Sequence, residues 1–122
     1  MNKILKKLID KSDVISFDIF DTLIKRNCLK PTDVFKFVEI KYNNLNKNKI
    51  SNFAFYRIEA EKKSREKVKN SETTLNDIYN CIDIFDNKTK EELKKIETET
   101  EYNFCQKNYK MFEVYKYCLE KN

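Results

Sequence analysis

The 122-residue chain has 25 lysines and arginines against 20 aspartates and glutamates, a formal net charge of +5, and neither histidine nor glycine. Without histidine it has no imidazole general base, no imidazole metal ligand and no Ser-His-Asp triad. Without glycine it has no P-loop and no dinucleotide-binding fingerprint, because both need glycine where the backbone approaches phosphate. The length suits a single domain whose chemistry depends on carboxylates, hydroxyls, lysine or cysteine.

The charges and cysteines favour a cytoplasmic protein. Lysine alternates with glutamate, as in residues 90–95, which is typical of a solvated helix face, so we expect no nucleic-acid partner. The four cysteines are widely spaced, with no Cys-x-x-Cys pair, which argues against a zinc site and predicts reduced thiols. Residues 1–11 lack the apolar run of a signal peptide, and no stretch is long enough to span a membrane.

The first predicted element is a short amphipathic helix over residues 2–10, ended by Ser12 and Asp13. Its apolar side chains lie at helical spacing between lysines, so we expect the helix to pack against the core. These side chains are Ile4, Leu5, Leu8 and Ile9. The alternative is a membrane-surface anchor, which the short length and the partly basic face disfavour.

The next stretch, Val14–Phe17, is rich in β-branched and aromatic residues and predicts a short buried strand. Asp18 follows at the point where this strand would end. In open α/β sheets ligands bind beyond the carboxyl ends of the strands. An aspartate there can act as a nucleophile and as a ligand for Mg²⁺. The structural alternative for residues 18–22 is a strand followed by an Asx-type turn, and residues 23–29 are expected to form a loop.

The remaining residues predict a series of helices. Pro31 begins one that runs to about Asn43, and Ser51 caps another that runs to about Asn70. Within the latter, Arg57 and Glu61 lie one turn apart as an i,i+4 pair.

Capping residues mark the starts of the last three predicted helices. Thr74 and Asp77 form a capping box for a helix that reaches Ile84. Asn87 and Asn108 are expected to cap the last two helices, of which the first runs from 88 to about 105. The whole chain is therefore expected to hold one strand and about six helices.

The stretch Phe17-Asp18-Ile19-Phe20-Asp21-Thr22-Leu23-Ile24 resembles motif I of the haloacid dehalogenase-like (HAD-like) hydrolases, which include many Mg²⁺-dependent phosphatases. On this pattern Asp18 takes the nucleophile position, Asp21 the usual glycine position and Thr22 the threonine position. Phe20 stands where phosphatases of the superfamily carry a second aspartate, the general acid/base. Dehalogenases are among the members with an aromatic residue there, so phosphatase and dehalogenase-like chemistry both stay open, as does replacement of that aspartate by Asp21.

Later segments extend the resemblance over most of the chain. Arg26 and residues 57–61, 74–79 and 113–118 are similar to a bacterial subgroup of predicted hydrolases. Members of that subgroup lie beside, or are fused to, glycosyltransferases of cell-surface polysaccharide synthesis. An association with a glycosyltransferase is therefore implied by the resemblance.

The resemblance implies an α/β fold with a HAD-like, Rossmann-type core, represented here only by its first strand, in a chain that is itself mostly α-helical. Residues 1–29 would be the N-terminal piece of that core with motif I. Residues 30–106 would be a helical cap inserted after it, and residues 107–122 a helix that returns to the core. The superfamily's later Ser or Thr, Lys and acidic pair are not found, so we expect a truncated hydrolase that is inactive as this chain alone.

The resemblance also implies roles for individual residues. Asp18 would form an aspartyl-phosphate, with Mg²⁺ held by the Asp18 carboxylate and the main-chain carbonyl of Phe20. Asp21, Thr22 and Arg57 would bind the substrate, a small phosphorylated molecule such as a sugar phosphate. For Arg57 the structural alternative is only the helical pair with Glu61.

Two other classes of function are compatible with the sequence. The first is a truncated or degenerate relative that acts as a non-catalytic protein-interaction module, which the missing second aspartate supports. The second is a helical nucleic-acid-binding domain, which only the net charge and the aromatics near lysines support.

Overall fold

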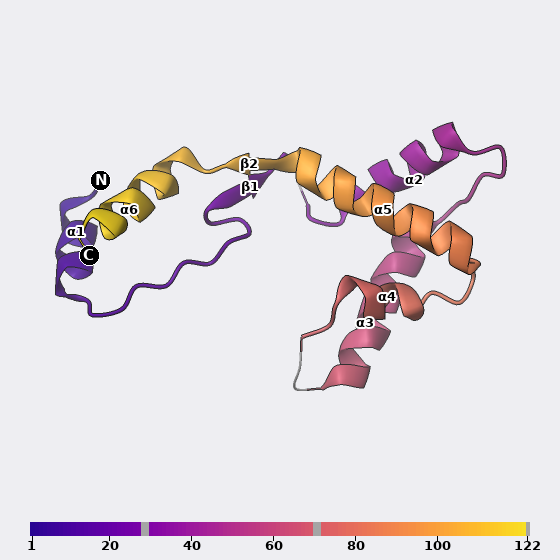
Figure 1. Ribbon diagram of the computed structural model, residues 1–122, viewed down its shortest axis with the longest axis horizontal. Coiled ribbons are helices and arrows are strands. Elements are labelled where there is room, and N and C mark those ends of the chain that lie inside the picture. The colour runs from indigo at the N-terminus through magenta and orange to yellow at the C-terminus, as the bar shows by residue number, and fades with distance from the viewer. Residues whose placement is uncertain (28–29, 70–71, 122) are drawn as a thin grey trace. The chain divides into compact units, whose positions relative to one another are not determined.

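The computed structural model describes residues 1–27, 30–69 and 72–121, and these residues are mostly helical. The chain divides into two compact units (Figure 1). The first comprises Met1–Asn27 and Phe104–Asn122, and the second comprises Cys28–Asn103. The expected predominance of α-helix is confirmed, and the only sheet among the described residues has two strands. No helix in the described ranges is long and apolar enough to cross a membrane.

The first unit begins with helix α1 (Lys3–Lys11), close to the predicted range. The Asn2 side chain accepts a hydrogen bond from the Ile4 amide at 2.7 Å, so it caps one of the amides that a helix start leaves without a partner. Ser12 ends the helix as predicted, with extended backbone, and its hydroxyl donates to the Leu8 carbonyl at 2.7 Å. Ile9 alone of the α1 side chains is buried.

The predicted strand over Val14–Phe17 is wrong. Residues 14–18 do not form a strand, and the Val14 side chain is 85% exposed. The backbone of residues 13–18 makes no hydrogen bond in turns or loops to the described part of the chain. A strand needs a neighbour to take up its backbone groups, and the described segments provide none here. Phe17 instead places its ring edge-on to Tyr115 of the C-terminal helix, with centroids 5.4 Å apart.

The two strands of the first unit lie where a loop and a helix end were expected. Strand β1 (Ile24–Arg26) pairs antiparallel with β2 (Cys105–Lys107), so that Lys25 lies opposite Gln106. The loop expected over 23–29 is therefore wrong at 24–26, and residues 28 and 29 lie outside the described residues. The helix expected to reach Cys105 ends at Phe104, because pairing with β1 takes over from there. Helix α6 (Tyr109–Glu120) completes the unit (Figure 1).

The second unit consists of α2 (Asp33–Leu45), α3 (Phe53–Val68), α4 (Leu75–Asn80) and most of α5 (Asn87–Phe104). The predicted capping box of α4 is confirmed: Thr74 Oγ1 accepts from the Asp77 amide at 3.1 Å, and the Asp77 carboxylate accepts from the Thr74 amide at 3.2 Å. The fully buried side chains are Val34, Val38, Phe53, Ser64, Ile82 and Leu93. This small apolar core holds the four helices together.

Three helix boundaries of this unit differ from expectation. The N-cap of α3 is Asn52 rather than Ser51, and the Phe53 amide donates instead to the Glu39 carboxylate at 2.9 Å. A carboxylate from α2 thus caps α3, which no local pattern indicates. Asp86, not Asn87, accepts from the Thr89 amide at the start of α5, at 2.8 Å. Helix α4 ends at Asn80, before the predicted end, and the predicted end of α3 near residue 70 lies outside the described residues.

Candidate functional site

The candidate site is a tight turn over residues 18–24 of the first unit. The Ile19 carbonyl accepts hydrogen bonds from the amides of Leu23 and Ile24, each at 3.0 Å. The Asp21 amide donates to the Ile24 carbonyl at 2.7 Å. These bonds fold the chain back on itself directly before β1, so that Asp18 stands at the entrance of the turn.

Asp18, the predicted nucleophile, is exposed. Among residues 1–27, 30–69 and 72–121 it has neither an ion-pair nor a hydrogen-bond partner for its carboxylate. An unpaired carboxylate keeps its lone pairs for an electrophile or a cation. In this respect the side chain is suited to both roles that the sequence indicates.

Asp21 has a backbone conformation that glycine adopts most easily. Its φ angle is 62°, in the left-handed region. Residues with a Cβ atom are sterically disfavoured in this region, and aspartate tolerates it better than most of them. Arg26 donates to the Asp21 carboxylate at 3.1 Å and lies over the Phe20 ring, 4.7 Å from its centroid. Asp21 thereby helps to close the turn onto β1.

The left-handed backbone leads to a paired prediction. Asp21→Gly is expected to unfold at the same or a higher temperature than the native chain, because glycine adopts a positive φ freely. The lost ion pair contributes little, since the Asp21 side chain is 63% exposed. Asp21→Val is expected to lower the free energy of unfolding by about 1–2 kcal/mol, since a β-branched residue pays the full steric cost. Thermal unfolding of the three proteins checks this. Equal losses in both variants would mean that the ion pair, and not the backbone, decides.

Thr22 is half-buried, and its main chain is fixed by a residue far away in sequence. Asn108 Nδ2 donates to the Thr22 carbonyl at 2.7 Å, and the Asn108 amide donates to the Leu23 carbonyl at 2.9 Å. Asn108 was predicted only as the cap of the last helix. It does occupy the N-cap of α6, but its side chain makes no capping hydrogen bond. Its part in the turn was missed, because spacing carries no signal of a contact 86 residues apart.

The same turn offers oxygen donors for a hard cation. The turn's hydrogen bonds use the carbonyls of Ile19 and Ile24 and leave the Phe20 carbonyl outside them. Together with the Asp18 carboxylate this makes two oxygens, the ligand type that Mg²⁺ prefers, and Mg²⁺ takes several further ligands from water and phosphate. The described residues contain no group of three or more acidic or sulfur ligands. The two oxygens are of the type that suits Mg²⁺, and their role as magnesium ligands stays a prediction.

An apolar pocket of about 450 Å³ lies beside the turn within the first unit. Ile19 and Leu23 of the turn line one part of it, and Phe112 and Tyr115 of α6 line another. Lys107 lies over the Phe112 ring at 3.8 Å from its centroid. The pocket wall is thus mostly apolar, with a cation at its rim.

Arg57 lies in the second unit and is only 5% exposed. Its Nε and Nη2 donate to the Glu97 carboxylate at 2.8 and 3.0 Å, and its Nη1 donates to Glu61 at 2.9 Å. The predicted i,i+4 pair with Glu61 is confirmed. The guanidinium also stacks on the Phe35 ring, 4.5 Å from the centroid. These contacts make Arg57 a core residue of its unit, and its role in substrate binding stays a prediction.

Glu97 and Tyr79 complete this buried network, and sequence reasoning missed both. The Tyr79 hydroxyl donates to Glu97 at 2.8 Å. Burial, and then the charge of Glu97, raise the pKa of Tyr79, so the hydroxyl stays protonated. Burial by itself lowers the pKa of Arg57, but the hydrogen bonds and charges of Glu97 and Glu61 outweigh it and raise that pKa. Tyr79 therefore stays a neutral donor and Arg57 stays a cation.

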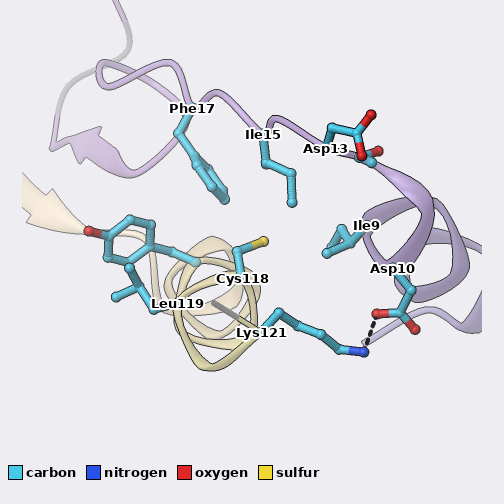
Figure 2. Close-up of a pocket in the computed structure, with 10 residues that line it drawn as sticks. Ile9, Asp10, Asp13, Ile15, Phe17, Cys118, Leu119 and Lys121 are labelled. Atoms are coloured by element: carbon cyan, nitrogen blue, oxygen red, sulfur yellow. Dashed lines mark ion pairs between the residues drawn. The ribbon is translucent and has the colours of Figure 1, made fainter.

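A second cavity of the first unit, about 260 Å³, lies beside α1 and α6 (Figure 2). Ile15 and Phe17 lie in the segment between α1 and β1, and their side chains extend toward Cys118 of α6. Asp10 accepts from Lys121 at 2.7 Å and from the Tyr117 hydroxyl at 2.6 Å. The hydrogen bonds from Lys121 and Tyr117 lower the pKa of Asp10. This polar cluster fastens α1 to α6.

The Asp10 cluster predicts how the α1 docking depends on pH. A carboxyl whose folded pKa is lowered stabilises the fold above its ordinary value of 3.8, and this contribution is lost as pH falls through the folded pKa. The hydrogen bond to Asp10 raises the pKa of Tyr117 above 10.0, so the tyrosine's contribution is lost only at higher pH. The methyl chemical shift of Ile9 is therefore expected to be constant between these limits and to change below about pH 4. Asp10→Asn should abolish the acid transition, whereas Asp13→Asn should leave it in place.

Comparison with protein-family models and with curated proteins finds no match for this chain.

Proposed function

We propose that this chain is the N-terminal part of a HAD-like, Mg²⁺-dependent hydrolase of the phosphatase type, with Asp18 as nucleophile. The observation that carries the proposal is an exposed Asp18 carboxylate, without a partner among the described residues, at the start of a hydrogen-bonded turn. Asp18 follows the apolar stretch of the motif I resemblance, but that stretch does not form the strand that the motif carries.

The order of the parts along the chain supports the proposal. The second unit, Cys28–Asn103, leaves after β1 and returns at β2, its pairing partner. An inserted unit whose two ends meet on paired strands can be added to a core without disturbing it. This is the arrangement expected of a helical cap inserted after motif I, with α6 as the helix that returns to the core.

In the proposed mechanism, an Asp18 carboxylate oxygen attacks the phosphorus of a phosphate monoester. The bond between phosphorus and the leaving oxygen breaks, and an aspartyl-phosphate forms. Water then attacks the phosphorus, releases inorganic phosphate and restores the carboxylate. Mg²⁺ bound by the Asp18 carboxylate and the Phe20 carbonyl would reduce the repulsion between the carboxylate and the phosphate. Thr22 and Asp21 would line the phosphate side of the turn.

Two features of the sequence limit what this chain does alone. Phe20 has no proton to give to the leaving group, and Asp21 is paired with Arg26. The lysine and the acidic pair of the superfamily have no counterpart in the 122 residues. We expect turnover only when a further polypeptide segment supplies them. A small phosphorylated molecule such as a sugar phosphate is the proposed substrate, in the cytoplasm, with a glycosyltransferase as the proposed partner.

A non-catalytic interaction module is the second candidate, and Phe20 in place of the general acid/base favours it. One experiment separates the two. The native protein is purified from its own cells, its intact mass is measured, and Mg²⁺-dependent phosphate release from sugar phosphates is assayed. A mass well above 14.8 kDa with Mg²⁺-dependent activity supports the hydrolase. A mass of 14.8 kDa without activity supports the interaction module.

A further inference from the structure

Helix α1 contacts α6 mostly through polar side chains and not through the centre of its apolar face. Ile9, in an apolar cluster with Val114 and Cys118, is its only buried side chain. The other contacts are polar: Asp10 with Tyr117 and Lys121, and Lys6 over the Tyr117 ring at 5.2 Å. The helix thus docks through one edge of its apolar face together with polar neighbours.

The rest of the apolar face is left uncovered. Ile4 is 70% exposed, Leu8 59% and Leu5 37%. Ile4 and Leu8 are one turn apart, so they form a row on the helix surface. Met1, at 52% exposure, is close to the start of that row. Removal of such apolar side chains from water is favourable, so the exposed row favours a partner that covers it.

Lysines flank this exposed row. Lys3, Lys7 and Lys11 are spaced by one turn each, and the helical repeat places this second row beside Ile4 and Leu8. Within the part of the chain that the structure describes, none of these three lysines forms an ion pair. The combination is an apolar strip bordered by free positive charge.

We propose that α1 binds the surface of an anionic lipid bilayer, lying in the plane of the interface. The apolar row of Ile4 and Leu8 inserts at the level of the headgroups, and the free lysines pair with lipid phosphates. A bilayer fits better than an acidic protein groove, because the apolar strip and the cations lie in adjacent parallel rows, as in interfacial helices. The sequence alone disfavours a membrane-surface anchor here, because the helix is short and only partly basic. The exposure of Ile4 and Leu8 beside the lysine row is the structural observation that favours it. The inference does not depend on the proposed hydrolase activity.

Co-sedimentation with vesicles tests the proposal. The native full chain is mixed with vesicles of phosphatidylcholine alone, or with equal parts of phosphatidylglycerol. Binding is expected only to the anionic vesicles and should weaken as salt is added. Lys7→Gln is expected to weaken it about fivefold, because each lysine near such a surface contributes on the order of 1 kcal/mol. The doubly substituted Ile4→Ser, Leu8→Ser chain is expected to bind at least about tenfold more weakly.

A matched control separates insertion of α1 from a general loss of apolar surface. Ile40 of α2 is 56% exposed, so Ile40→Ser removes a similar side chain from the second unit. It is expected to leave vesicle binding unchanged. Equal binding of all these proteins to anionic vesicles would overturn the proposal, as would binding to polyglutamate but to neither vesicle. The salt dependence of the native chain keeps the test decisive should the double variant misfold.

Discussion

Arg57→Met is expected to lower the free energy of unfolding of the second unit by about 3–5 kcal/mol. Methionine keeps most of the length and packing of arginine, but it leaves the Glu97 carboxylate without its cation and leaves Glu61 paired with Arg65 alone. Glu97 is only 6% exposed, so its charge cannot be solvated in place of the lost pair. Removal of one partner from a buried ion pair costs far more than the pair contributes in net terms.

Arg65→Met is the matched control for this prediction. Arg65 also donates to Glu61, at 2.7 Å, but its side chain is 64% exposed. An exposed pair of this kind contributes about 0–1 kcal/mol, so the control should unfold almost like the native chain. Hydrogen exchange of the α3 and α5 amides in urea reports on this unit directly. Similar losses in both variants would show that burial does not set the cost.

Asp18→Asn is expected to lower Mg²⁺-dependent phosphate release by the native full-length protein by about a thousandfold or more, because an amide oxygen is a poor nucleophile. The change is isosteric and the side chain is exposed, so the fold should be unaffected. The measurement is phosphate release at saturating substrate. Mass spectrometry after acid quenching should show one added phosphoryl group in the native protein and none in the variant.

Asp13→Asn provides the control for that experiment. Asp13 is an exposed aspartate five residues earlier, and it lines the cavity beside α1 rather than the turn (Figure 2). Its substitution should leave both turnover and the phosphoryl adduct in place. Activity that survives in Asp18→Asn would rule out Asp18 as the nucleophile and leave the interaction module as the better account.

Local chemistry was sufficient to predict most of the helices. Apolar spacing marked α1, and the Thr74 and Asp77 pair marked the start of α4, because both signals act within one or two turns of the chain. The i,i+4 pair of Arg57 and Glu61 followed from helical geometry alone.

Contacts between segments far apart in the sequence could not be predicted from local spacing. The β1–β2 pairing joins residues about 80 positions apart, and short three-residue strands carry almost no periodic signal. The cap of α3 by Glu39 and the anchoring of the turn by Asn108 are of the same kind. For Val14–Phe17 the prediction of a strand was wrong. Its composition suits a strand, but a strand forms only where a neighbouring segment takes up its backbone hydrogen bonds.

By itself the sequence determined the helical character of this protein, the approximate positions of most of its helices and the capping box of α4. These depend on side chains within a few residues of one another. Only the tertiary structure decided that Arg57 is buried between Glu97 and Glu61, and that α1 leaves its apolar row uncovered. The physical reason is that burial and pairing depend on which distant side chains fill the same volume, and spacing along one chain segment does not encode this.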